Sequence, residues 1–188
     1  MALTLFARRP EPVEAPAPAP WPEIGETWKP EGATVVQRYY NQAHAVVLVY
    51  TAAENYRHVV ACLGCHFTKA NSAARSCGWL DLKGAADIAN GHATTCRALP
   101  RDIPSRPDDD AVRDQLRQWV VGQRRHQSED TELWISFLDP VRPTLQRTNI
   151  WIETALRQLA DTQPDIVVAK TSEYTEVTRF YARSYPEI

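Results

Sequence analysis

The sequence predicts an α+β fold: a small antiparallel sheet with a cysteine knuckle and a helix, followed by a mostly helical C-terminal region. Three observations predict it. Segments rich in Val and Tyr lie between residues 34 and 61, paired Cys and His residues follow them, and apolar residues recur at helical spacing after residue 110. β-branched and aromatic residues favour strands, whereas an apolar period of 3.6 residues favours helices.

The composition is that of a chain with one or two small domains. The chain has 188 residues, of which 44% are hydrophobic and 23% are charged. It contains no run close to the roughly 20 apolar residues that span a bilayer. The first ten residues also lack the apolar centre and cleavage site of a secretory signal. We therefore expect a cytoplasmic protein without membrane contacts, in which thiols stay reduced and serve as metal ligands more often than as disulfides.

The chain divides into three segments by composition. Residues 1–25 form a Pro/Ala-rich tail that we expect to be flexible, because alternating Pro, Ala and Glu cannot bury enough apolar surface to become ordered. A docking peptide around Trp21 is the alternative for this tail. Residues 26–103 are predicted to be a β-rich metal-binding module. Residues 104–188 are predicted to be helical, and either pack on the module or dimerise.

Within the module, three Val- and Tyr-rich segments predict an antiparallel meander. They are TVVQRYY from residue 34, AVVLVYT from residue 45 and NYRHVVA from residue 55, separated by polar breaks. A helix over residues 34–53 is the alternative, because Ala and Gln are interleaved there. Residues 84–99 have apolar residues at helical spacing between Gly84 and Pro100, which predicts a short amphipathic helix.

The C-terminal region contains further helical patterns. Residues 111–126 carry an apolar stripe, residues 133–138 form a shorter helical stretch before Pro140, and a third pattern runs from Pro143 to Leu159. The end of the chain, residues 164–185, is rich in Thr, Val and Tyr. Its spacing favours a helix that begins at Pro164, and a pair of strands is the alternative.

Two pairs of potential metal ligands are the clearest functional signal in the sequence. Cys62 and Cys65 flank a tight turn in which Gly64 lets the backbone fold back, so both sulfurs can point at one centre. His92 and Cys96 are four residues apart and therefore lie on the same face of a helix. Zinc prefers four tetrahedral sulfur and nitrogen ligands in a closed structural site, and these two pairs supply them.

The same residues fit other sites less well. Cys62, Cys65 and His66 spell the attachment pattern of c-type haem, but that chemistry needs export and leaves His92 and Cys96 without a role. A thioredoxin-like dithiol would need a βαβ pattern around the two cysteines. Scattered free thiols are the simplest alternative. Cys77 and His66 remain spare ligands, because the segment between the two pairs is longer than in a compact finger.

The segment from Cys62 to Pro100, with its CLGC turn and ANGHATTCRALP helix, resembles small zinc-finger-like proteins of high-GC actinobacteria, some of them carried on plasmids and other mobile elements. The resemblance covers about a fifth of the chain. It implies that Cys62, Cys65, His92 and Cys96 are the zinc ligands, and it points to nucleic-acid binding or regulation.

The charge distribution is compatible with that function. Residues 57–106 hold seven basic and three acidic side chains, a net charge of +4, within a chain whose net charge is −2. We expect this basic segment to contact DNA phosphates. The candidate contact residues are Lys69, Arg75, Lys83, Arg97 and Arg101. A protein-interaction adaptor, in which zinc only holds the module together, is the alternative. The sequence contains no Gly-rich phosphate loop, no Gly-x-Ser-x-Gly motif and no convincing pair of catalytic carboxylates. We therefore expect that the protein is not an enzyme.

Overall fold

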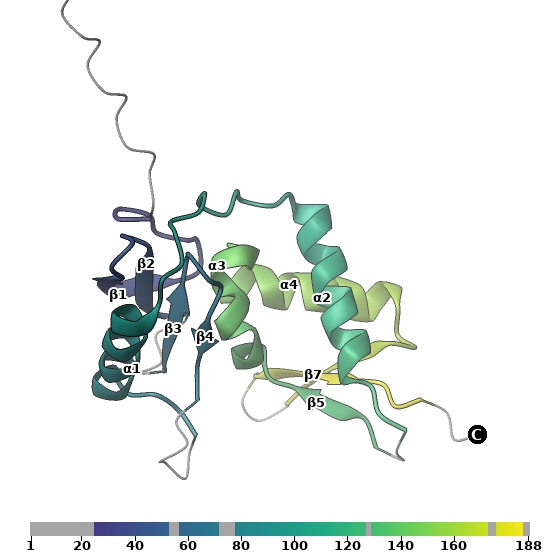
Figure 1. Ribbon diagram of the computed structural model, residues 1–188. Coiled ribbons are helices and arrows are strands. Elements are labelled where there is room, and N and C mark those ends of the chain that lie inside the picture. The colour runs from purple at the N-terminus through teal and green to yellow at the C-terminus, as the bar shows by residue number, and fades with distance from the viewer. Residues whose placement is uncertain (1–24, 53–56, 72–77, 127–128, 173–175, 186–188) are drawn as a thin grey trace, which may run out of the picture.

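The computed structural model confirms the α+β class (Figure 1). It describes residues 25–52, 57–71, 78–126, 129–172 and 176–185. Two antiparallel sheets, one of four strands and one of three, are each covered by helices. None of the helices in these ranges is long and apolar enough to cross a membrane.

The first sheet is a meander of four strands in chain order. The strands are β1 (Thr34–Tyr40), β2 (Val46–Thr51), β3 (His58–Cys62) and β4 (Thr68–Lys69). The three predicted strands are present, and β4 is a short addition that follows the cysteine turn. The third strand begins at His58 rather than at residue 55, and residues 53–56 lie outside the described ranges.

Both faces of this sheet are covered, which explains the unbroken apolar run of β2. Helix α1 (Leu82–Thr95) packs on one face, where its small side chains Ala85 and Ala89 meet Val49 and Val60. On the other face, the Tyr50 hydroxyl donates a hydrogen bond of 2.8 Å to the Asp139 carbonyl in the C-terminal half. The sheet is therefore the layer that joins α1 to the rest of the molecule.

The cap of α1 fixes where this helix begins. The Asp81 carboxylate accepts a hydrogen bond of 2.8 Å from the Gly84 amide, so the helix starts at Leu82 rather than at residue 84. It ends at Thr95, four residues before the predicted end, because Cys96 is already extended.

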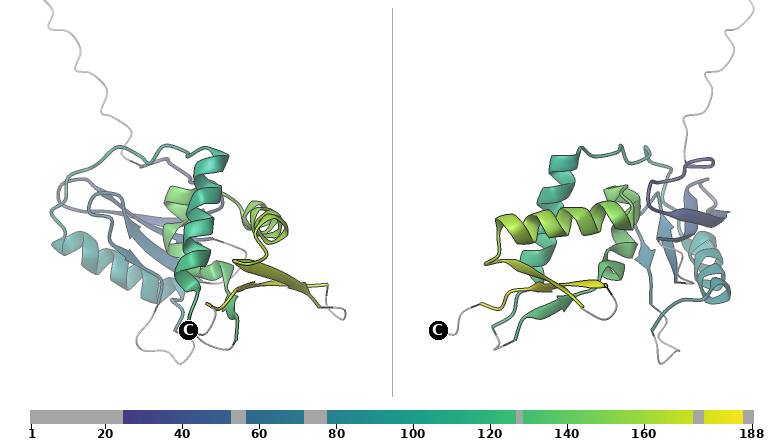
Figure 2. Two further views of the ribbon diagram at one scale, coloured as in Figure 1. Left: turned by 90° about the vertical axis from the view of Figure 1, so that its right-hand side faces the viewer. Right: turned by 180° about the vertical axis from the view of Figure 1, so that it is seen from behind.

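In the second half, two helices cover one face of a three-stranded sheet (Figure 2). The helices are α2 (Asp109–Gln123) and α4 (Asn149–Thr162), and the strands, in spatial order, are β5 (Thr131–Leu133), β7 (Thr178–Ala182) and β6 (Val167–Thr171). Leu116 and Ile152 of the helices pack with Phe180 of the sheet in one apolar core. The predicted helix over residues 111–126 corresponds to α2, which begins slightly earlier behind the N-cap Asp108.

The helix predicted over residues 164–185 is wrong, because this segment forms β6 and β7. Pro164 follows the end of α4 and does not open a new helix. Val167 and Phe180 point into the core at strand spacing, and Thr and Val favour that conformation. The alternative of a strand pair is the correct one.

Two further helix predictions need correction. Residues 133–138 do not form an α-helix: β5 ends at Leu133, and a 3₁₀ helix, η1 (Ile135–Val141), follows and includes Pro140. The helix predicted from Pro143 to Leu159 is divided into α3 (Arg142–Leu145) and α4. Gln146 separates them in a left-handed conformation with φ of 47°, which no helix accommodates.

Candidate metal centre

The turn after β3 carries the first ligand pair. Cys62 is the last residue of β3, and its amide donates to the Phe67 carbonyl at 2.8 Å across the turn. Gly64 lies so close to its neighbours that an added Cβ would stand 2.8 Å from the Ala45 Cβ and 3.0 Å from the Leu99 carbonyl oxygen. The turn therefore needs glycine because of close packing against the chain that follows α1.

The end of α1 carries the second pair. His92 lies in the last turn of the helix, and Cys96 is its C-cap. The Cys96 amide still donates to the His92 carbonyl at 2.8 Å, which keeps the two residues one turn apart on the same face. The early end of α1 thus leaves Cys96 extended while its side chain stays beside that of His92.

The structure brings the two pairs together. The ligand atoms of Cys62, Cys65, His92 and Cys96 all lie within 4.8 Å of one another. The Cys65 Sγ and the His92 Nε2 are 3.3 Å apart. In a tetrahedral site with metal–sulfur bonds of about 2.3 Å, neighbouring ligand atoms are about 3.7 Å apart. The four side chains can therefore hold one metal ion after their ligand atoms shift by less than the length of a metal–sulfur bond.

Cys62, Cys65, His92 and Cys96 form what we call the metal cluster. Neighbouring backbone amides act to lower the pKa values of two of its thiols, those of Cys62 and Cys96. Burial raises the pKa of the Cys62 thiol to about 11, and the amides of Cys65 and Gly64 oppose that effect. The Ala98 amide lowers the pKa of Cys96, and the Asn41 side chain adds to the effect. Burial also lowers the pKa of His92, which favours the neutral imidazole that binds metals.

Two neighbours of the cluster were not predicted from the sequence. Phe67 stacks on the His92 ring, with centroids 4.3 Å apart and an interplanar angle of 11°. The buried Asn41 amide donates to the Ala98 carbonyl at 2.8 Å and lies 3.5 Å from the Cys96 Sγ. In the sequence, Asn41 stood out only by its place in a polar break between two predicted strands. Asn side chains in such turns often form hydrogen bonds with nearby backbone groups.

The spare ligands have different positions. His66 has a φ of 60°, and its Nε2 lies 2.8 Å from a guanidinium nitrogen of Arg101, outside the cluster. Cys77 lies outside the described residues, as does most of the segment between the two ligand pairs. Within the described part of the chain, the cluster of Cys62, Cys65, His92 and Cys96 is the one group of this kind.

The basic side chains predicted to contact DNA have different surroundings. Lys69 is exposed on β4, whereas Lys83 forms an ion pair of 2.8 Å with Asp87 on the same helix. Arg97 bends back to the Thr94 carbonyl at 3.0 Å, and Arg101 contacts His66. Arg75 lies outside the described residues. Arg97 and Arg101 are both exposed and both follow the end of α1, next to the metal cluster.

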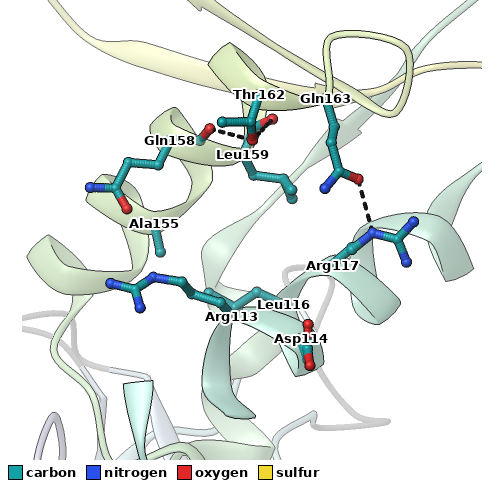
Figure 3. Close-up of a pocket in the computed structure, with 9 residues that line it drawn as sticks. All are labelled: Arg113, Asp114, Leu116, Arg117, Ala155, Gln158, Leu159, Thr162 and Gln163. Carbon is teal, nitrogen blue, oxygen red and sulfur yellow. Dashed lines mark hydrogen bonds between the residues drawn. The ribbon is translucent and has the colours of Figure 1, made fainter. Parts of the chain in front are cut away.

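A separate cavity of about 250 Å³ lies between α2 and α4 in the C-terminal half (Figure 3). Leu116, Ala155 and Leu159 form its apolar part. The Arg117 side chain donates to the Gln163 side-chain oxygen at 2.9 Å across one end. The ionisable residues of its lining are Arg113, Arg117 and Asp114. This cavity shares no residue with the metal cluster, and its lining holds no cysteine, histidine or serine.

The candidate site therefore consists of one ligand pair at the end of β3 and in the turn after it, and a second pair at the end of α1, with the Asn41 side chain next to Cys96. Comparison with known proteins found no matching family model, no matching curated protein and no matching solved structure.

Proposed function

We propose that this chain is a non-enzymatic zinc-binding protein in which Cys62, Cys65, His92 and Cys96 hold one structural zinc ion. The single observation that carries the proposal is the convergence of these four ligand atoms within 4.8 Å. Three thiolates and one imidazole are a ligand set typical of structural zinc. Carboxylate-preferring cations such as calcium and magnesium do not suit it.

A c-type haem site and a redox dithiol, the two other interpretations of the cysteine turn, fit the geometry less well. A c-type haem would need His66 as its ligand, but the Nε2 of His66 is engaged by Arg101 at 2.8 Å. A redox dithiol would use Cys62 and Cys65 alone, whereas the His92 Nε2 lies 3.3 Å from the Cys65 sulfur. Zinc gives all four residues one role.

A structural role follows from the number of ligands and from their positions. Four protein ligands close the coordination sphere, whereas a catalytic zinc keeps a position open for water or substrate. The ion would tie the end of β3 to the end of α1, and so fasten the helix to the sheet it covers. Part of the folding free energy of the module would then come from metal binding.

The proposed biological role is that of a DNA-binding accessory or regulatory factor. Lys69, Arg97 and Arg101 support this role, because they are exposed cations close in sequence to the metal ligands. Binding of this kind displaces counterions from phosphates, so the affinity would fall steeply with salt, with a log–log slope of about −0.9 per phosphate contact on duplex DNA.

Charge reversal tests this role. The double variant Arg97→Glu/Arg101→Glu should reduce the salt slope by about two contacts. Its zinc content should not change. The matched control is Arg113→Glu/Arg157→Glu, which makes the same charge change on two exposed arginines of α2 and α4. Equal duplex affinity and slope in all three proteins would contradict DNA binding by this surface.

An adaptor role is the second candidate, and exposed apolar side chains around η1 favour it. Trp134 is 51% exposed and Phe137 is 56% exposed, and the Phe137 amide donates to the Trp134 carbonyl at 2.8 Å, so the two are neighbours. Large exposed aromatic residues are enriched at protein interfaces. Sedimentation as a dimer that Trp134→Ser/Phe137→Ser dissociates, together with absent retention on heparin, would favour this role.

A further inference from the structure

Among the helices that the structure describes, none covers the outer face of the three-stranded sheet. Both α2 and α4 pack on the opposite face, and no helix lies against the outer face in any of the three views (Figures 1 and 2). Side chains alternate between the two faces of a sheet. Because Phe180 is buried under the helices, its neighbours Arg179 and Tyr181 on β7 point outward.

The strand register puts an aromatic ring at the centre of this face. Tyr181 pairs with Glu132 of β5 on one side and with Val168 of β6 on the other. The Lys170 ammonium lies 4.6 Å from the centroid of the Tyr181 ring. An aromatic ring on an open sheet offers a platform on which a planar group can stack.

Cations surround this ring. Arg179 and Arg183 precede and follow Tyr181 at two-residue spacing on the same side of the chain, and their side chains are 60% and 45% exposed. Beyond Arg183, the Arg124 side chain donates to the Arg183 carbonyl at 2.9 Å. A row of positive charge therefore runs along β7, and Arg124 at the end of α2 lies next to the last arginine of that row.

Two carboxylates reduce this charge without cancelling it. Glu132 lies 3.4 Å from Arg179, and Asp130 lies 3.2 Å from Arg183. Both carboxylates are more buried than their partners, with 29% and 17% exposure, so the arginines project beyond them. Exposed ion pairs of this length are weak and can be exchanged for other anions. Among the residues that the structure describes, no carboxylate pairs with Lys170.

From this arrangement we infer that the outer face binds single-stranded nucleic acid. Lys170, Arg179 and Arg183 would contact phosphates, and one base would stack on Tyr181. A duplex hides its base faces, whereas a single strand exposes them for stacking on aromatic side chains. An acidic peptide could form ion pairs with the three cations, but it would offer no planar group to stack on the Tyr181 ring. The inference goes beyond the proposed function, because it uses the second sheet and none of the residues near the metal cluster.

Fluorescence anisotropy with the full-length, zinc-loaded protein tests the inference, using a labelled oligo-dT strand and a duplex of mixed sequence. Binding of the single strand should have a log–log salt slope of about −2, from three phosphate contacts at about −0.7 each. Tyr181→Ala should weaken binding about tenfold through lost stacking, and Tyr181→Phe should retain it. Lys170→Glu/Arg179→Glu should weaken binding further and flatten the slope.

The control is again Arg113→Glu/Arg157→Glu, whose charge change is the same but lies on the helices of the opposite face. It should leave single-strand binding nearly unchanged. Three results would overturn the inference: no binding of the single strand at low salt, equal losses in Tyr181→Phe and Tyr181→Ala, or a loss confined to Arg97→Glu/Arg101→Glu. Binding of a poly-glutamate peptide in place of the strand would also overturn it. Zinc content is measured on each variant, so failure of the metal proposal is seen separately.

Discussion

The side-chain nitrogen of Asn41 lies 3.5 Å from the sulfur of Cys96, although the two residues are 55 positions apart in the chain. The same nitrogen donates to the Ala98 carbonyl at 2.8 Å. The Asn41 side-chain oxygen accepts from the amides of Ala43 and Ala45, which shapes the turn between β1 and β2. One buried amide thus links the first turn of the sheet to the last ligand of the candidate metal centre.

Replacing Asn41 should weaken both stability and metal binding. Asn41→Ala leaves two turn amides and the Ala98 carbonyl without their partner, which should cost about 1–3 kcal/mol in the free energy of unfolding. Loss of an outer-shell partner should lower zinc affinity about tenfold or more in a chelator competition. The control, Gln42→Ala, alters an exposed neighbour in the same turn. Unchanged affinity in Asn41→Ala would show that the contact with Cys96 is incidental.

Replacement of single ligands should separate the proposed set from the spare cysteine. Cys62→Ser and Cys96→Ala each remove one of four ligands, so the purified proteins should contain little zinc and unfold without a cooperative transition. Cys77→Ser should be close to wild type in both respects. Zinc analysis and circular dichroism on the three variants make the comparison. Loss of metal in Cys77→Ser with retention in Cys96→Ala would assign the ligands differently.

The buried Arg142 is expected to be a major contributor to the stability of the C-terminal half. It is fully buried, and it donates to Asp139 at 3.2 Å, to Asn149 at 2.7 Å and to the Arg147 carbonyl at 2.9 Å. Arg142→Ala leaves Asp139 as a buried charge without its partner and should lower the free energy of unfolding by about 3–5 kcal/mol. The matched control, Arg113→Ala, breaks an exposed pair with Asp110 and should cost at most about 1 kcal/mol. Urea unfolding measures both, and similar costs would contradict the expectation.

The contact between Asp109 and Arg147 should make stability depend on pH. Hydrogen bonds from Arg147, at 2.7 and 3.1 Å, hold the pKa of Asp109 below its usual value. A carboxyl with a lowered folded-state pKa stabilises the fold above its ordinary pKa, and loses that contribution as the pH falls through the folded-state value. Asp109→Asn should therefore be less stable than wild type at pH 7, and the gap should close in acid below about pH 4.

The comparison for Asp109 uses the difference between the two proteins at each pH, because acid also protonates the metal ligands of both. Asp110→Asn serves as the control for the charge at the start of α2, since Asp110 contacts the exposed Arg113 instead. A gap between wild type and Asp109→Asn that stays constant from pH 7 to pH 3 would contradict the assigned role.

Local sequence patterns were sufficient to predict the residues of the metal cluster and the first three strands of the first sheet. The spacing of Cys62 with Cys65 and of His92 with Cys96 fixes each pair within one turn, so only the meeting of the two pairs depended on the fold. The Val- and Tyr-rich composition of residues 34–61 likewise predicted the meander of β1, β2 and β3. Both predictions rest on interactions between residues close in sequence.

The parts that the sequence did not predict depend on distant partners. Residues 164–185 fit both a helical and a strand period, and the choice is made by β7, which pairs with β5 on one edge and β6 on the other. Arginine is rarely buried, so nothing marked Arg142 and Arg147 as core residues. The left-handed Gln146 that divides α3 from α4 is held from outside its helix, through a side-chain hydrogen bond of 2.8 Å to the Pro104 carbonyl.

Elemental analysis of the purified protein is the direct test for one structural zinc ion on Cys62, Cys65, His92 and Cys96. Full-length protein is purified under reducing conditions without added metal, passed through gel filtration and assayed for zinc, iron and other transition metals. We expect one zinc per chain, and a cooperative thermal transition that is lost when a strong chelator removes the metal. A protein with reduced thiols that contains no zinc, does not take it up, and melts at the same temperature with and without chelator would show that the four residues hold no structural zinc.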